Sequence, residues 1–157
     1  MKKFTFSLKM GAIIPLFIVF TAFSAAGLLE EQSGYIQKKL LEHYDAEQGN
    51  LKVKKTELNV TNTGFCRYKR HFENGKIEYM SFNLLKFKDL DYIGNVKSGQ
   101  LLIRTIGDDV IVQTYNDKKG DIDSMAAVMA IPLKQVEAED LNDFVEKFRQ
   151  MHENLKK

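Results

Sequence analysis

The sequence predicts an α+β fold: an N-terminal helix, about six antiparallel strands in a meander, and a C-terminal helix packed on one face of the sheet. Three observations support this prediction. Apolar residues recur at helical spacing over residues 28–48, the pattern changes to a period of two from residue 51, and one apolar stripe returns over residues 137–154. Strands that alternate in this way have one polar face, so we expect the helices to cover the other face only.

The first 27 residues differ from the rest and predict export. Lys2, Lys3 and Lys9 precede an apolar run over residues 10–29, and such an arrangement keeps the N-terminus in the cytoplasm while the following chain crosses the membrane. Two interpretations remain open. The small residues over 22–27 suit a cleaved signal peptide, whereas the length of the apolar run suits a retained membrane anchor. Either one places residues 28–157, a single α+β domain, in the periplasm or another extracytoplasmic space.

The charge balance argues against nucleic acid as a partner. The chain has 23 basic and 21 acidic residues, and three of the lysines belong to residues 1–27. The remaining chain is therefore almost neutral, unlike the basic domains that bind nucleic acid.

The elements of the expected domain follow in order. The first helix places Ile36, Leu40 and Tyr44 on one face and ends at Gly49-Asn50. Strands are expected over residues 51–60, 65–72, 76–87, 100–106, 110–115 and 124–133, the last of them in the centre of the sheet. The C-terminal helix begins with acidic residues, which suit the positive end of its dipole.

Turn signals separate these strands. Asn74-Gly75 predicts a tight hairpin, because both residues tolerate positive φ. Residues 107–109 predict a second hairpin, between the strands 100–106 and 110–115. Residues 88–99, which contain two glycines, predict a 12-residue loop.

No catalytic signature is present, which favours a protein that is not an enzyme and uses no cofactor. The chain has no G-x-S-x-G elbow, no Walker A loop and no zinc-binding histidine motif. The one cysteine, Cys66, alternates with apolar residues and is expected to be a small buried side chain. His71 lies five residues further along the same strand, so the two side chains point to opposite faces and do not pair.

A basic patch on the strand 65–72 is the first candidate site. Arg67 and Lys69 project from one face together with His71, while Tyr68, Arg70 and Phe72 take the other. Such a row of cations suits an anionic ligand or lipid headgroups. The alternative is a solvated sheet face whose charges discourage aggregation.

The loop 88–99 is the second candidate site. Leu90, Tyr92 and Ile93 lie within it, and ordered loops of this length are often functional. We expect it to border a mostly apolar pocket or to present a surface to a protein partner. The alternative is a loop whose apolar residues only cap the core.

The stretch NDKKGDID, residues 116–123, is the third candidate. Asp117, Asp121 and Asp123 supply the carboxylate oxygens that calcium prefers. Their spacing does not match an EF-hand, because Gly120 falls between the acids rather than after three of them. A turn explains the same residues, since Gly120 adopts positive φ readily.

These observations predict an exported, non-enzymatic binding or accessory module, whose ligand or protein partner is not identified. The alternative is a small calcium-dependent module or enzyme that uses the Asp117/Asp121/Asp123 cluster. In element order, with an export segment leading into a helix and then an antiparallel sheet, the chain resembles PAS-like or Cache-like extracytoplasmic sensing domains. The resemblance assigns no role to any residue, because no motif matches.

Overall fold

The computed structural model describes residues 27–157. The predicted signal peptide or anchor therefore lies outside the described residues, except for its last position. Within residues 27–157, no helix is both long enough and apolar enough to cross a membrane.

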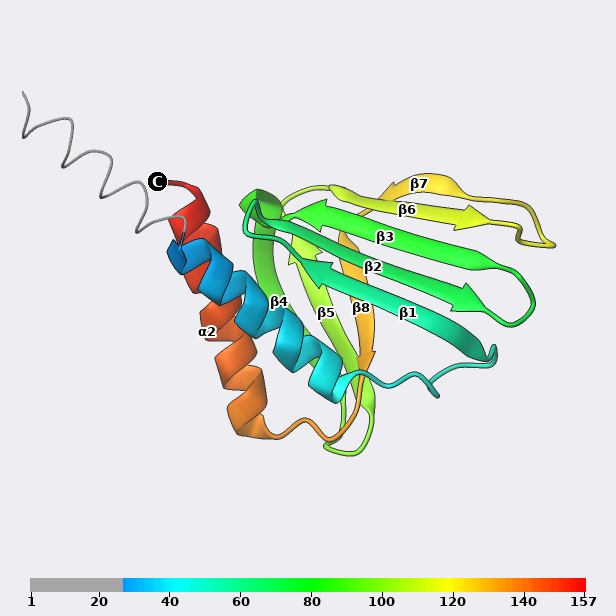
Figure 1. The fold of residues 1–157 in the computed structure, drawn as a ribbon, viewed down its shortest axis with the longest axis horizontal. Helices are drawn as coiled ribbons and strands as arrows, with labels where there is room; N and C mark the ends of the chain where they lie inside the picture. Colours follow the sequence, from blue (N-terminus) through cyan, green and yellow to red (C-terminus); the bar gives the residue numbers. More distant parts are fainter. Residues whose placement is uncertain (1–26) are drawn as a thin grey trace, which may run out of the picture.

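The predicted α+β class is confirmed, with eight strands in two antiparallel sheets between two helices in the described part of the chain. The first helix occupies residues 27–43 and the last, α2, spans Ala138–Leu155. One sheet has the order β1-β2-β3-β6-β7 and the other the order β4-β5-β8 (Figure 1). The strands are β1 (Val53–Val60), β2 (Phe65–Phe72), β3 (Ile77–Asn83), β4 (Phe87–Gly94), β5 (Gly99–Thr105), β6 (Val110–Tyr115), β7 (Asp123–Ala126) and β8 (Val128–Leu133), with the short 3₁₀ helix η1 (Leu84–Lys86) before β4.

The predicted six-strand meander is wrong in how it groups the strands. Residues 88–99 are not a loop but most of β4 and its turn into β5. The two glycines that suggested a loop lie opposite each other, Gly94 and Gly99, where β4 turns into β5. Within the strand pair, Arg104 Nη1 and Nη2 lie 2.8 Å from Asp89 and 3.1 Å from Asp91. The predicted hairpin over residues 100–115 does not form, because β5 and β6 belong to different sheets.

Two further boundaries differ from the prediction. Residues 124–133 are not one central strand; they divide at Ala127 into β7 and β8, each at the edge of its sheet. The first helix ends at residue 43, rather than 48, because Tyr44 and Asp45 pair with the edge of β8: the Asp45 backbone N–H donates to the Pro132 carbonyl at 3.0 Å.

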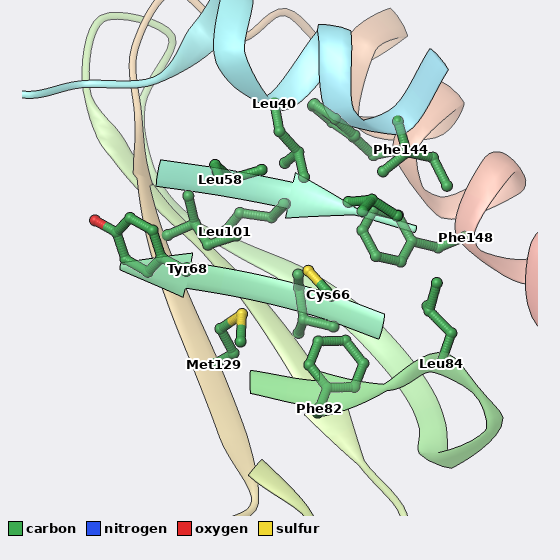
Figure 2. Close-up of a cluster of buried hydrophobic side chains, with 14 of the residues drawn as sticks. Leu40, Leu58, Cys66, Tyr68, Phe82, Leu84, Leu101, Met129, Phe144 and Phe148 are labelled. Atoms are coloured by element: carbon green, nitrogen blue, oxygen red, sulfur yellow. The ribbon is translucent and has the colours of Figure 1, made fainter. Parts of the chain in front are cut away.

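The core lies between the two sheets and beneath the helices. Figure 2 shows Leu40 of the first helix and Phe144 and Phe148 of α2 pointing toward the strands. The inner faces of the sheets contribute buried residues that include Leu58, Val60, Cys66, Tyr68, Phe82, Leu101, Ile103, Met129 and Ile131. Cys66 is fully buried, as expected, and burial raises the pKa of its thiol to about 12.

The two helices lie side by side and are joined by polar contacts. Lys39 Nζ lies 3.0 Å from a carboxylate oxygen of Asp140, and the Tyr35 hydroxyl donates to Asp143. In Figure 1 both helices lie at one end of the five-stranded sheet, and the β2–β3 and β6–β7 turns lie at the other. The helices therefore leave the end of the sheet that carries these turns uncovered.

Candidate functional site

A pocket of about 510 Å³ lies at this uncovered end. We call it the turn pocket, because its walls are the segment 48–51, the β2–β3 hairpin and residues 117–119 of the β6–β7 turn. Arg70, Phe72 and Glu78 line it from the inner face of the five-stranded sheet. Its size falls within the range of pockets that bind small molecules.

A chain of alternating charges crosses the turn pocket. Arg70 and Glu78 face each other in the β2–β3 register, and Arg70 Nη2 donates to Glu78 Oε2 at 2.5 Å. Lys76 Nζ then lies 2.9 Å from Glu78 Oε1 and 2.8 Å from Asp117 Oδ2. These side chains are 15–23% exposed, so water screens their interactions only partly.

The contacts shift the pKa values of three of these groups in the direction that keeps them charged. Hydrogen bonds to Asp117 and Glu78 raise the pKa of Lys76. The Lys76 ammonium and the Lys119 backbone N–H lower the pKa of Asp117. Burial alone would raise the pKa of Glu78, but Lys76 and Arg70 together outweigh it and lower that pKa.

Arg70 is held by aromatic rings as well as by Glu78. Its guanidinium carbon lies 5.4 Å from the ring centroid of Tyr68 and 5.2 Å from that of Phe72, within cation–π range. Its Nε is buried without a hydrogen-bond partner in the described part of the chain. The charge is thus fixed in place at the floor of the pocket.

Cations outnumber carboxylates among the charged groups that line the pocket. Both oxygens of Glu78 accept from Lys76 or Arg70, and the two oxygens of Asp117 accept from Lys76 and from the Lys119 backbone N–H at 3.0 Å. Lys118 and Lys119 are exposed on the rim. Neither makes an ion pair within residues 27–157, so the four cations exceed the two carboxylates.

Arg67 and Lys69, the predicted basic patch, lie on the opposite face of the same sheet. There they line a separate pocket of about 420 Å³ with Tyr79 and Glu57. His71 projects from this face too, as expected, and its Nε2 lies 3.0 Å from a Glu57 oxygen. The structure does not bring this patch together with the turn pocket.

The second set of predicted residues is divided between two surfaces. Leu90 and Tyr92 are half-buried and pack against the core from β4, and the Tyr92 hydroxyl donates to the Asn95 carbonyl at 3.0 Å. Ile93 points outward and is 62% exposed. None of the three pockets described in residues 27–157 is lined by residues 88–99.

The predicted turn at residues 116–123 is confirmed, since it joins β6 to β7 with Asn116 at φ 58° and Gly120 at φ 104°. Of its acids, Asp117 pairs with Lys76, Asp121 accepts from the Asp117 backbone N–H at 2.9 Å, and Asp123 accepts from Gln113 at 3.1 Å. Residues 27–157 contain no group of three or more acidic, histidine or cysteine side chains placed to hold a metal ion. Cation binding at this turn stays a prediction.

Of the ionic side chains in the turn pocket, only Asp117 was among the candidate site residues predicted from the sequence. One signal was present: Arg70 occupies a position of β2 where the alternation calls for an apolar residue, between Tyr68 and Phe72. A charge in the apolar phase of a strand needs a partner, and Glu78 supplies it from the neighbouring strand.

No protein-family model matches the chain, and comparison with curated proteins and with solved structures gives no significant match. Its function is therefore inferred from the geometry of the described residues.

Proposed function

We propose that this protein is an exported, non-enzymatic binding module and that the turn pocket is its ligand site. The observation that carries the proposal is the charged chain from Arg70 to Asp117, which is held in place by hydrogen bonds and open to solvent on one side. Fixed polar groups in a pocket lose little conformational freedom when a ligand binds. The basic and apolar pattern of residues 1–29 supports export.

Backbone-amide NMR of the full-length chain, titrated with a chemically mixed set of small molecules, tests the ligand site. We expect the shifted amides to cluster in residues 48–51, 70–78 and 117–119. Shifts confined to the face that carries Arg67 and Lys69, or no saturable shift at all, would refute the proposed site.

Export is tested separately, by intact mass and membrane fractionation of the expressed protein. Loss of about the first 27 residues supports a cleaved signal peptide, and an intact chain in the membrane fraction supports an anchor. A full-length chain in the cytoplasmic fraction would contradict export.

The alternative proposal is a calcium-dependent module that uses Asp117, Asp121 and Asp123. It is supported by the presence of three carboxylates in one turn, and it would place the calcium ion near the Lys76 ammonium, which lies 2.8 Å from Asp117. A site occupied well above its dissociation constant stabilises the fold, so thermal unfolding with millimolar calcium or a chelator decides the question. An unchanged midpoint would eliminate this alternative.

A further inference from the structure

We infer that the turn pocket recognises a small organic anion, with Lys118 and Lys119 as the cations that attract it and Phe72 and Leu51 as the wall that contacts its carbon skeleton. The inference rests on the proposed function, because it assigns a ligand class to the same site.

First, the carboxylates of the pocket are already paired with protein cations. Glu78 accepts from Lys76 and Arg70, and Asp117 accepts from Lys76 and from the Lys119 backbone N–H. A cationic ligand at these oxygens would lie beside the Lys76 ammonium and the Arg70 guanidinium, which repel it. An anionic ligand is attracted by the same two groups.

The second step is the supply of donors. Lys76 has three N–H groups and uses two of them, toward Glu78 and Asp117. Arg70 donates to Glu78 through Nη2 alone among its terminal nitrogens. The ammonium groups of Lys118 and Lys119 make no ion pair within residues 27–157. An incoming carboxylate or other oxyanion therefore meets N–H groups that are not already engaged by a carboxylate.

The third step is the apolar wall, which separates an organic anion from an inorganic one. Phe72 belongs to the pocket lining, and its ring is held against the Arg70 guanidinium. Leu51 also lines the pocket, from the segment before β1, and is 42% exposed. Contact with these two side chains removes apolar ligand surface from water, a gain that inorganic phosphate cannot make.

The absence of tryptophan from the chain allows a clean assay. Leu51→Trp places one indole on the pocket wall, and Leu85→Trp, at a residue 44% exposed on η1, is the control of matched exposure. The full-length variants, in a neutral detergent, are titrated with benzoate, benzamide, benzylamine and inorganic phosphate. We expect benzoate to change the emission of Leu51→Trp saturably and to leave Leu85→Trp unchanged. Phosphate should bind more weakly than benzoate, and benzamide and benzylamine more weakly still.

A second experiment removes positive charges from the rim of the pocket and measures benzoate affinity. Lys118→Gln combined with Lys119→Gln should weaken benzoate binding about tenfold, the effect of removing two partly solvated attractive charges. The control is Lys88→Gln combined with Lys38→Gln, which removes two exposed lysines, one on β4 and one on the first helix, and should leave the affinity unchanged. Raising the ionic strength should weaken benzoate binding to the parent pocket.

The outcomes separate the ligand class from the site. The pocket would still be a binding site, but not one selective for anions, if benzamide or benzylamine bound there as tightly as benzoate. The same conclusion would follow if the Lys118→Gln/Lys119→Gln variant bound benzoate with the affinity of the parent chain. If no probe changes the emission, and benzoate does not raise the thermal midpoint of the unsubstituted chain, the anion inference is overturned. The broader site proposal is then decided by the NMR titration, which does not depend on charge.

Discussion

The Arg70–Glu78 pair predicts a measurable coupling energy. The test compares Arg70→Met, Glu78→Gln and the double variant with the parent chain, because a double-mutant cycle isolates the interaction from the separate cost of each change. The two side chains are only 22% and 23% exposed, and the donor and acceptor atoms lie 2.5 Å apart. The pair should therefore contribute more than a solvent-exposed one.

The expected magnitude follows from that burial. Exposed ion pairs contribute about 0–1 kcal/mol, and hydrogen bonds to charged groups about 1.5–3 kcal/mol. A pair that is largely but not fully buried should lie between them, so we expect a coupling free energy of roughly 1.5 kcal/mol. Because the free energy of unfolding falls by about 2 kcal/mol per molar urea, this coupling corresponds to a shift of roughly 0.75 M in the urea concentration at the unfolding midpoint.

The assay is equilibrium urea unfolding followed by circular dichroism. Lys55 and Glu57 supply the matched control, because their charged atoms lie 2.9 Å apart on the same sheet while the side chains are 65% and 45% exposed. That cycle should show no coupling outside experimental error. Equal coupling in the two cycles, or none for Arg70 and Glu78, would refute the argument from burial.

Three further predictions concern the core and the acid limit of stability. Phe148→Ala should cost about 3–5 kcal/mol of unfolding free energy, because the side chain is fully buried; a midpoint shift under urea measures it, and a loss below about 1.5 kcal/mol would contradict tight packing there. Cys66, buried and with its pKa raised to about 12, should react with a disulfide reagent at pH 8 only as fast as the protein opens, and reaction of the native chain at the rate of a free thiol would disprove its burial. Folding lowers the pKa values of Glu78 and Asp117. Their ionised carboxylates therefore contribute to the free energy of unfolding above the pKa values of the unfolded chain, near 4, and this contribution is lost as the pH falls through the lower pKa values of the folded chain. Urea unfolding at pH 3 to 5 should show a shallower loss of stability for Glu78→Gln than for the parent chain, and parallel curves would rule the contribution out.

Local signals predicted the elements that depend on local chemistry. The hairpin at Asn74-Gly75 forms, with Gly75 alone at positive φ (88°), because a glycine reaches the conformation that this turn requires without strain. The stripe containing Phe144 and Phe148 formed α2 for a similar reason, since a period of 3.6 residues gathers these side chains on one face.

The partition of strands into two sheets was not predictable from the same signals. Alternation shows which side of a strand is apolar, but it does not show which strand will be its neighbour. The bend at Ala127 and the short helix η1 redirect the chain between sheets, and neither carries a glycine or proline that would mark it. On β4, the two glycines suggested a loop, whereas they only form the turn at which Gly94 lies opposite Gly99.

In the turn pocket, the contact between Asp117 and Lys76 was not predictable from local sequence, whereas the need of Arg70 for a partner was. Asp117 and Lys76 are distant in sequence and meet only because β3 pairs with β6, so that the two turns lie at the same end of the sheet. Arg70 was different, because its position between Tyr68 and Phe72 conflicts with the apolar phase of its own strand. A charge that breaks the alternation of a buried strand face requires compensation. In this fold that compensation, by Glu78, lies where the helices leave the inner face open to solvent.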